Sequence, residues 1–567
     1  MGVQGLWDIL NKAGQSRAFK NLTVVDGFEE NESGRRAYRV GIDASIWYHH
    51  ATFSKGGENP ELRLFFFRLC KLLEFPLIPL FVFDGRERPK VKRGSKLGKA
   101  GSHNLTARVK QLLDCYGIEW RMARGEAEAE LACLNRAGVI DAILTDDVDT
   151  LVFGARTVIK NPSLSLTGNK ANPAQNYEGK TSKYHVMVFS AEALRNHPEV
   201  QMTRGGLVLF ALLSGGDYDK GLNHFGPQIA HGLARLGFGD RLLEAYERQS
   251  GRNMTHFLSQ WRAEINVELH TNAHKLLRCP YPSLSIPEDF PDMDVLRNYI
   301  NPVCSASVGH QGGGALRDNG DLSIPRLAAF CEDHFGEWGH RSGILKRFRN
   351  VIWEASVIRV LRRAALEADE LEKTKRIRAE RTDTAIRGVL QLPTTEGVGT
   401  PASLVKKYLS PAEVDHRAAI FVQRNNNPAP LAGAEPDMYP MIRKILSARH
   451  HVSTDNLLEY RVEVDPRQLV ALAESGIKGK HREPAGLANV SDDDSNEDDD
   501  EDATSSQGTN RRKRKKIKAP VDPQSMMRLW IPACMMRQVH PELVEDYEEA
   551  ERAKLAKKNG AQRRRRK

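Results

Sequence analysis

The residues of this sequence that are most able to do chemistry are acids at the ends of short apolar runs. Taken singly, each acid is more simply a helix cap or a solvated loop residue, so the inference rests on their combination. They come from five separated stretches: Asp43, Asp84, Glu126, Glu128, Asp147, Asp149 and Asp217. Carboxylates gathered in one place repel one another unless cations neutralise them. Because no His or Cys accompanies them, these hard oxygen ligands suit Mg²⁺ or Mn²⁺ better than zinc.

Such a cluster favours hydrolysis of a nucleic-acid backbone. Two Mg²⁺ ions about 4 Å apart can activate a water molecule and stabilise the leaving oxygen of a phosphodiester. Asp147 and Asp149 lie two residues apart, so that on extended backbone both would face one site. In an ideal helix Glu126 shares a face with Glu130 rather than with Glu128. Spacing alone therefore leaves the choice among these glutamates open.

The elements that must position the acids read as an α/β sheet. The apolar runs Tyr38–Asp43, Leu77–Asp84 and Ala142–Asp147 predict buried strands of a parallel sheet. Helical patterns lie between and after them, at 61–74, 107–116, 126–137 and 206–214. In a sheet whose strands alternate with helices, ligands bind at the carboxyl ends of the strands. The acids of this sequence lie at those ends.

Composition limits the class of protein. The 567 residues predict two to four domains, and the excess of 83 Lys and Arg over 73 Asp and Glu suits a polyanionic partner. Seven scattered cysteines without a CxxC pair indicate reduced thiols rather than a disulfide frame or a zinc site. The most apolar stretch, Leu64–Phe83, contains charged residues and predicts a core helix followed by a buried strand. With no secretory signal, we expect a soluble intracellular protein with no membrane partner and no small-molecule substrate.

The second half of the chain predicts a helical extension and linker over 276–405, with one long basic helix from Ile344 to about Arg381. Three strands follow, Met441–Arg449, Leu458–Val464 and Arg528–Pro532, and a helix opens at Pro541. The acidic block 491–502 and the basic block 511–518 cannot build a core, so we expect disorder over 476–522. The block 511–518 also predicts nuclear localisation, and 551–567 forms a basic tail.

Six motifs occur in order within the first 250 residues: Met1–Trp7, Gly41–Ser45, Phe83–Gly85, Gly125–Ala129, Thr145–Asp149 and Gly215–Tyr218. Together they resemble the flap endonuclease/XPG-type nuclease superfamily. The resemblance implies a PIN-like (Rossmann-like) nuclease core over 1–275, with halves at 1–100 and 117–250 and a helix–two-turn–helix at about 205–240. It also implies that the metal ligands are Glu126 and Glu128 rather than Glu130, and Asp147 and Asp149 rather than Asp146.

The resemblance further implies a set of DNA-binding residues: Gly2, Arg86, Arg88, Lys92, Arg93, Lys96, Lys99 and Gly226. Among them, Lys92 matches a residue that positions the scissile phosphate in the family, which makes it a catalytic candidate. Gly2 belongs to a segment that packs near the branch point of the DNA. Gly226 lies in the helix–two-turn–helix, where the family binds K⁺, although His224-Phe225-Gly226 here replaces the usual Gly-hydrophobic-Gly.

Within the superfamily, the sequence is most similar to the nuclear Holliday-junction resolvases. Few residues separate Asp84 from Glu126, so the arch between them is shorter than in flap endonucleases and junctions without free ends could enter. The segments 406–475 and 523–550 resemble a chromodomain, as in that branch, with Val464 where a cage tryptophan is expected. The resemblance implies homodimers on four-way junctions and cleavage of 5′ flaps.

Two alternatives stay open at this point. A monomeric 5′-flap endonuclease or 5′ exonuclease would share the same acids, although its sliding-clamp motif has only a poor candidate in Gln524, Met527 and Trp530. An inactive nuclease fold that binds DNA or chromatin would be favoured by the loss of a carboxylate. All seven matching positions are acidic.

Overall fold

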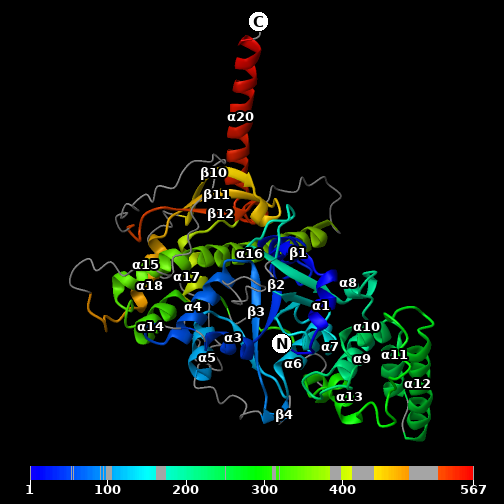
Figure 1. The fold of residues 1–567 in the computed structure, drawn as a ribbon. Coiled ribbons are helices and arrows are strands. Elements are labelled where there is room, and N and C mark those ends of the chain that lie inside the picture. Colours follow the sequence, from blue (N-terminus) through cyan, green and yellow to red (C-terminus); the bar gives the residue numbers. More distant parts are fainter. Residues whose placement is uncertain are drawn as a thin grey trace, which may run out of the picture.

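The computed structural model describes residues 2–52, 54, 56–89, 91–92, 95–96, 105–160, 174–248, 251–308, 314–317, 320–383, 397–410, 440–483 and 521–565. Its centre is a seven-stranded sheet in the order β1-β9-β8-β7-β2-β3-β6 (Figure 1). Strands β8, β7, β2, β3 and β6 are parallel, whereas β9 and β1 extend one edge antiparallel. The bounds are β1 Gln15–Ala18, β2 Tyr38–Asp43, β3 Leu77–Phe83, β6 Glu119–Met122, β7 Ala142–Leu144, β8 Thr157–Lys160 and β9 His185–Ser190. The predicted α/β fold and its three strands are confirmed.

Side chains that alternate along the central strands build a separate core on each face of the sheet. On β3, Phe81 and Phe83 face one core, whereas Leu80 and Val82 face the other. The first core contains helices α3 (Ala44–Ala51), α4 (Pro60–Leu73) and α5 (Thr106–Cys115). The second contains α6 (Ala127–Arg136), α7 (Asp149–Val152) and α9 (Arg204–Ser214). Gly41 of β2 lets α6 approach closely, because a Cβ there would lie 2.5 Å from Leu131.

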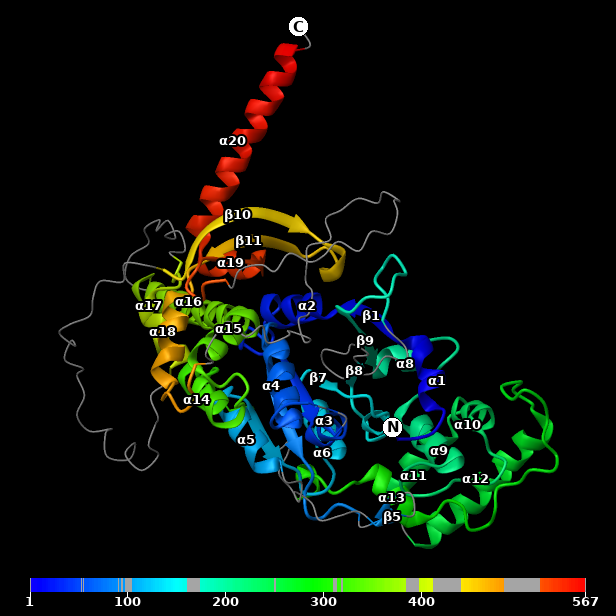
Figure 2. The same cartoon turned by 60° about the vertical axis from the view of Figure 1, so that its left-hand side comes forward.

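A helical lobe extends from the second face of the sheet (Figures 1 and 2). It comprises α9, α10 (Pro227–Ala234), α11 (Phe238–Arg248), α12 (Arg252–Thr271) and α13 (Met293–Ile300). The short helices α1 (Leu6–Leu10) and α8 (Ala191–Asn196) also pack into this core. Helices α9 and α10, joined by a turn that contains His224 at φ 69°, stand where the helix–two-turn–helix was predicted.

The predicted single helix from Ile344 to about Arg381 is wrong. The structure has two helices, α15 (Arg341–Val351) and α16 (Trp353–Asp383), with a break at the β-branched pair Val351-Ile352. The break lets Trp353 pack in the first core, where it is fully buried. Along α16, the buried Arg359 donates to the carbonyls of Leu77 and Phe75 at 2.5 and 2.6 Å. This helix therefore packs against the start of β3.

The predicted three-stranded sheet is present, in the order β10-β11-β12. Its strands are β10 (Ile442–His450), β11 (Leu458–Val464) and β12 (Met527–Pro532), and the predicted helix from Pro541 is α20 (Pro541–Arg565). The connection from β11 to β12 also contains helix α18 (Arg467–Gly476), which packs on α14 (Ile324–His334). Helix α20 projects away from the rest of the molecule (Figures 1 and 2).

Two aromatic residues of this part, Trp530 and Tyr547, are half-buried. The Arg449 guanidinium carbon lies 4.0 Å from the centre of the Trp530 ring. The ring centre of Tyr547 lies 5.6 Å from that of the buried Tyr460. Val464 is completely buried.

The charge blocks 491–502 and 511–518 lie outside the described residues. Of the predicted insert 476–522, residues 476–483 and 521–522 are described, and Lys478 and Lys480 donate their backbone N–H groups to Glu332 of α14.

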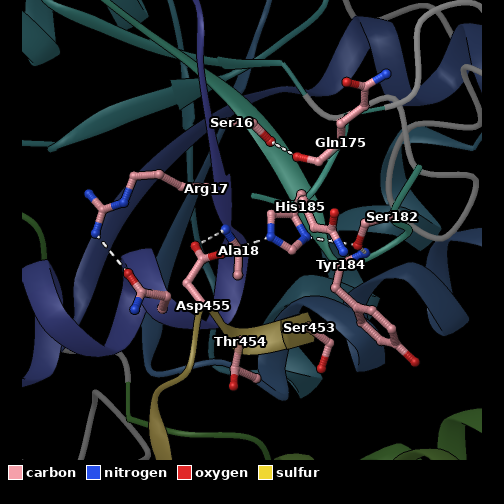
Figure 3. A network of polar contacts seen from close by, with 12 residues as sticks. Ser16, Arg17, Ala18, Gln175, Ser182, Tyr184, His185, Ser453, Thr454 and Asp455 are labelled. Carbon is pink, nitrogen blue, oxygen red and sulfur yellow. Dashed lines mark hydrogen bonds and ion pairs between the residues drawn. The ribbon is translucent and has the colours of Figure 1, made fainter. Parts of the chain in front are cut away.

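The three-stranded sheet is docked on the central sheet through Asp455 (Figure 3). Asp455 follows β10 in a left-handed conformation, with φ 49°. Its two carboxylate oxygens accept a hydrogen bond from the Ala18 backbone at 2.7 Å and contact Nε2 of the buried His185 at 2.9 Å. Nδ1 of the same ring lies 2.7 Å from Ser182 Oγ. One aspartate therefore joins the β10–β11 turn to both antiparallel edge strands, β1 and β9.

A buried histidine lies near the start of the three-stranded sheet. His540 is 8% exposed, and its Nε2 lies 3.1 Å from Thr400 Oγ1, which in turn accepts a hydrogen bond from the Ile442 backbone. Burial lowers the pKa of His540 to about 4.

Among the helices of the described ranges, none combines the length and the apolar character needed to cross a bilayer.

Replacing Asp455 by Ala should loosen the docking of the three-stranded sheet. A hydrogen bond to a charged group stabilises the folded state by about 1.5 kcal/mol or more. Because the variant loses such bonds, the turn should open more often and amide exchange in residues 452–457 should accelerate at least about tenfold. Hydrogen–deuterium exchange with mass spectrometry measures this rate. Asp294→Ala, which removes an exposed ion pair with Arg297, is the control and should leave exchange at 452–457 unchanged. Equal exchange in both variants would show that Asp455 does not hold the turn.

Stability should fall on acidification because of His540. His540 binds a proton near pH 6.5 in the unfolded state, whereas in the folded state it stays neutral until about pH 4. The stability that neutral His540 contributes is therefore complete above pH 6.5 and is lost as the pH falls from 6.5 towards 4. From pH 7 to pH 5 the loss amounts to about 2 kcal/mol in the free energy of unfolding. Denaturant unfolding at both pH values measures it. His540→Gln should reduce the difference, and an unchanged difference would contradict the assignment.

Candidate active site

The carboxyl ends of three neighbouring parallel strands meet at one edge of the central sheet. Asp43 is the last residue of β2, Asp84 follows β3, and the segment Thr145–Asp149 follows β7. Because β7, β2 and β3 are adjacent and parallel, these acids lie at the same edge. The sheet therefore brings together acids that are far apart in sequence, as the strand pattern predicts.

Asp43 and Asp84 are linked through Ser45. Asp43 is 2% exposed and accepts a hydrogen bond from the Ser45 backbone at 2.7 Å, which also caps α3. The Ser45 hydroxyl donates to Asp84 Oδ2 at 3.3 Å, and the Ala127 backbone donates to Asp84 Oδ1 at 3.0 Å. Burial, followed by the negative charges of Asp84 and Asp147, raises the pKa of Asp43 to about 7. Negative charge at this edge is therefore costly without a cation.

The glutamates at the start of α6 do not share one helical geometry. Glu126 is the N-cap, with φ −85° and ψ 143°, so it lies outside the helix whereas Glu128 is in the first turn. Tyr218 OH donates a hydrogen bond to Glu126 Oε2. Burial, and then Glu126, Glu128 and Asp149 in that order, raise the pKa of Tyr218. Both glutamates and Asp149 therefore lie around one tyrosine, which helical periodicity could not indicate.

Glu130 points to a different place. Its carboxylate accepts hydrogen bonds from the backbone and the hydroxyl of Ser305, the backbone contact at 2.8 Å. It therefore holds a later segment of the chain onto α6. This agrees with the family pattern, which excludes Glu130 from the metal ligands.

Asp147 and Asp149 converge through a turn rather than through extended backbone, so the predicted local geometry is wrong. Val148 has helical angles, and the Asp149 backbone donates to Asp147 Oδ1 at 3.1 Å. Gly2 packs directly on both side chains, since a Cβ at Gly2 would lie 2.2 Å from Asp149 Oδ1 and 2.4 Å from Asp147 Oδ1. The Val3 backbone donates to Asp149 at 2.9 Å. The N-terminal segment is thus part of the site.

Asp146 lies in the same segment as Asp147 and is buried. Its negative charge raises the pKa of Lys160, while burial of that lysine lowers it more strongly. Trp7 Nε1 donates to the Asp146 carbonyl at 2.9 Å, and the Lys160 ammonium lies 4.5 Å from the Trp7 ring centre. Asp146 therefore belongs to a neighbouring structural contact.

Asp217 lies on a segment that packs against Val3. It is 5% exposed and follows Gly215, at φ 83°, and Gly216 after α9. A Cβ at Gly216 would lie 3.1 Å from Val3 Cγ2, and Val3 in turn binds Asp149. The segment that bears Asp217 therefore lies beside the N-terminal segment that contacts the other acids.

As they stand, the carboxylates accept hydrogen bonds rather than enclose a formed metal site. Within the described ranges, no group of three or more His, Cys, Asp or Glu side chains is arranged closely enough to hold a metal ion. Backbone N–H groups of Ser45, Ala127 and Val3 occupy oxygens that a cation would use. The donor set itself, carboxylate oxygens only, fits Mg²⁺ or Mn²⁺.

The predicted DNA-binding residues are only partly described. Arg86 is exposed, whereas Arg88 Nη1 binds Asp84 Oδ2 at 2.8 Å and so belongs to the acidic site. Lys92 and Lys96 lie on the two-residue strands β4 (Val91–Lys92) and β5 (Ser95–Lys96), which pair antiparallel. Their side chains lie outside the described structure, as do the residues Arg93 and Lys99. Gly226 is the exposed N-cap of α10, with open space where a Cβ would stand.

Sequence reasoning missed three supporting residues of this site. Ser45 bridges Asp43 and Asp84, Tyr218 holds Glu126, and Trp7 anchors the segment that bears Asp147. Ser45, Tyr218 and Trp7 each stand inside a motif quoted for the family resemblance, which was the one available indication. Their partners, however, depend on contacts between distant segments.

Comparison with known proteins identifies the domains of this chain. Three family models match in succession: the XPG N-terminal domain over residues 1–101, the XPG I-region over 117–217, and the Holliday junction resolvase Gen1 C-terminal domain over 441–550. A crystal structure of the Holliday junction-resolving enzyme GEN1 with product DNA and Mg²⁺ matches 97% of this chain and 100% of its own, with a TM-score of 0.61 and 24% identity. That likeness shows the shared fold.

Two relatives extend the comparison. The human protein "Flap endonuclease GEN homolog 1" is 30% identical over 271 residues, which are 44% of this chain and 26% of that protein. "Holliday junction resolvase YEN1" of Saccharomyces cerevisiae is 24% identical over 461 residues, 62% of this chain and 60% of that protein. The chain thus spans about a quarter of the length of the human relative. From the three domain matches in this order, the chain belongs to the flap endonuclease/XPG-type nuclease family, in its Holliday-junction resolvase branch.

Proposed function

We propose that this protein is a structure-specific DNA endonuclease that resolves Holliday junctions by paired, symmetric nicks and also cuts 5′ flaps. The observation that carries the proposal is that Asp43, Asp84 and the segment Thr145–Asp149 lie at one edge of a parallel sheet, with Glu126, Glu128 and Asp149 around Tyr218. The raised pKa of Asp43, caused first by burial and then by Asp84, supports a need for cations there. The names of the human and yeast relatives and of the GEN1 crystal structure support the choice of substrate.

Two Mg²⁺ ions, for which Mn²⁺ would substitute, suit the site. The residues that would hold them are Asp43, Asp84, Glu126, Glu128, Asp147, Asp149 and Asp217. When bound, such ions activate a water molecule and stabilise the leaving oxygen of a phosphodiester. Crystal structures of GEN1 with Mg²⁺ and Mn²⁺ support divalent-metal use in this branch. We further propose a K⁺ ion at the turn before α10, near Gly226; a related structure is described as a eukaryotic junction-resolving enzyme GEN-1 binding with potassium.

The chain's own residues would orient the carboxylates and the DNA. Ser45 sets the directions of Asp43 and Asp84, and Tyr218 holds Glu126. Arg88 places a positive charge beside Asp84, within reach of a phosphate that enters the site. Lys92 would position the scissile phosphate, with Arg86, Arg93, Lys96 and Lys99 as further phosphate contacts. Gly2, packed on Asp147 and Asp149, would bring the N-terminal segment to the branch point.

The segment between Asp84 and α5 supports a junction as the substrate. In its described part it contains only the short ribbon of β4 and β5. A short arch would require less threading of a free 5′ end than a long helical one. The sheet β10-β11-β12, firmly docked through Asp455, is proposed as an auxiliary contact for DNA or protein. Its strand β12 contains Met527 and Trp530, and pairing with β11 makes a sliding-clamp motif there a poor fit.

Resolution requires two cuts, so we propose that two copies act together on one junction. Each copy would nick one strand, because a single cluster of this kind serves one phosphodiester at a time. The basic block 511–518, outside the described residues, supports a nuclear location.

Asp43→Asn should reduce cleavage by at least about 100-fold. Loss of a residue that merely orients a metal ligand already lowers metal affinity or activity about 10- to 100-fold, and Asp43 is proposed as a ligand itself. Junction binding should persist, since phosphate contacts come from basic residues. Single-turnover cleavage and gel-shift binding on the same four-way junction measure the two effects. Asp147→Asn should behave in the same way.

Asp146→Asn is the matched control for these variants. It removes a charge from the same segment, but that charge acts on Lys160 and the family pattern excludes Asp146 from the metal ligands, so cleavage should stay close to that of the unmodified protein. Loss of cleavage in the control to the same extent, or full cleavage in Asp43→Asn and Asp147→Asn, would contradict the proposed site.

The substrate is tested with Mg²⁺ and three DNA molecules: a static four-way junction, a 5′ flap and a blunt duplex. We expect symmetric paired nicks across the junction, cleavage of the flap and no cleavage of the duplex. Strand-specific end labels locate each cut. Cleavage of the flap alone would favour a flap endonuclease, and cleavage of none would favour a binding protein with an inactive fold.

A further inference from the structure

A lysine side chain lies on two aromatic rings at the carboxyl end of the edge strand β6. The Lys110 ammonium of α5 is 4.0 Å from the centre of the Trp120 ring and 4.9 Å from the centre of the Phe83 ring. The same nitrogen donates to the Met122 sulfur at 3.3 Å. The two rings meet edge to face, with their centres 6.2 Å apart. These four residues, Lys110, Phe83, Trp120 and Met122, are here called the β6 step.

The β6 step borders the acidic edge of the central sheet. Strand β6 is parallel to β3, and Met122 pairs in register with Phe83, the residue before Asp84. The Ala123 backbone then donates to the Phe83 carbonyl at 2.8 Å, so the two chains continue side by side beyond their strands. Neighbouring strands of a sheet lie about 4.8 Å apart. A DNA strand bound at Asp84 would therefore pass the β6 step within its next few nucleotides.

The step offers an apolar surface whose ring is held in one orientation. Met122 is 46% exposed, although it ends a strand of the central sheet. Trp120 beside it is half-buried, and its ring nitrogen donates to Asp114 at 3.0 Å. A thioether makes favourable contacts with aromatic rings, and the bases of nucleic acids are such rings. The exposed sulfur of Met122 is thus suited to an unstacked base.

The charge of Lys110 is oriented but not cancelled by these contacts. Ring faces and a thioether attract an ammonium group without carrying a net negative charge. Burial lowers the pKa of Lys110 more than the charge of Asp114, one turn further along α5, raises it. A lysine that is already held in place loses less freedom when it binds an anion. The β6 step therefore presents a positioned cation beside an exposed apolar side chain.

We propose that the β6 step binds the DNA strand next to the scissile phosphate, with Lys110 holding one phosphate and Met122 lying against the adjoining base. This inference rests on the proposed nuclease function and names further residues that position its substrate. Trp120 and Phe83 would act by orienting Lys110. The phosphate contact is independent of base sequence. The base contact needs an unstacked base, which a branch point supplies and a continuous duplex supplies only at an energetic cost. The β6 step would therefore favour branched DNA.

Neutralising one phosphate at a time tests the lysine contact. Static four-way junctions are prepared, each with a single methylphosphonate near the branch point, which removes one negative charge. Fluorescence anisotropy measures their binding to the full-length protein, with EDTA present so that no strand is cut. We expect one position at which the affinity falls at least about tenfold, as for the loss of a charge-assisted hydrogen bond.

Lys110→Met keeps a long side chain over the rings but lacks the charge. This variant should bind the unmodified junction at least about tenfold more weakly, and the methylphosphonate at the sensitive position should weaken its binding no further. The dependence of its binding on salt concentration should also be shallower, by about one phosphate contact. Lys110→Arg keeps the charge and should restore the sensitivity to that methylphosphonate.

Met122→Ser tests the base contact separately. It should weaken binding to the junction about two- to tenfold, in the range of sulfur–aromatic contacts, and leave binding to a blunt duplex unchanged. Equal weakening on both DNA molecules would overturn the base contact.

Lys373→Ala is the control for the loss of a lysine charge. Lys373 is an exposed residue of α16, the helix that packs against the start of β3 at the opposite edge of the sheet. This variant should keep both the affinity and the sensitive position. If Lys110→Met also keeps the sensitive position, the inference is wrong while the proposed function stands. If the unmodified protein binds no branched DNA, the proposed function fails as well.

Discussion

Carboxylates that converge on one sheet edge repel one another, and much of the surrounding protein serves to hold them there. Asp43 experiences this repulsion most directly, because it is buried beside Asp84 and Asp147. Backbone N–H groups of Ser45, Ala127 and Val3 stabilise individual carboxylates. These donors lie on three different segments. The cluster therefore depends on the packing of the whole nuclease core rather than on any one loop.

The N-terminal segment shows how tight that packing is. Gly2 lies against Asp147 and Asp149 in a conformation with positive φ, where any side chain would strike both carboxylates. Trp7 fastens the same segment to the Asp146 carbonyl. A glycine at this place is thus required by contact with the acids, in addition to any contact with DNA. The N-terminal segment and the acidic edge form one unit.

The C-terminal sheet is integrated with the nuclease core. Asp455 binds both antiparallel edge strands, and Lys20 pairs with the fully buried Glu459 at 2.7 Å. Residues of β10, β11 and β12 share a continuous apolar core with α4, α14 and α16. Docking of this kind holds the sheet at a constant position relative to the acidic edge. Residues 301–308 play a comparable part on the other face, where they connect α13 to the helix that bears Glu128.

The sequence by itself determined the strands, the acids at their ends and the order of the family motifs. It could do so because burial of a strand or of one helical face leaves a local periodic pattern, and because β2, β3 and β7 each end at an acid. Only the tertiary structure decided how the acids converge. Glu126 stands at an N-cap and Asp149 begins a helix, so neither follows the geometry that its spacing suggests.

The break between α15 and α16, helix α18 and the Asp455 contacts were likewise beyond the reach of the sequence. Each results from contacts between segments that lie far apart along the chain. Local pattern records which side of a segment is buried, but not which distant partner buries it.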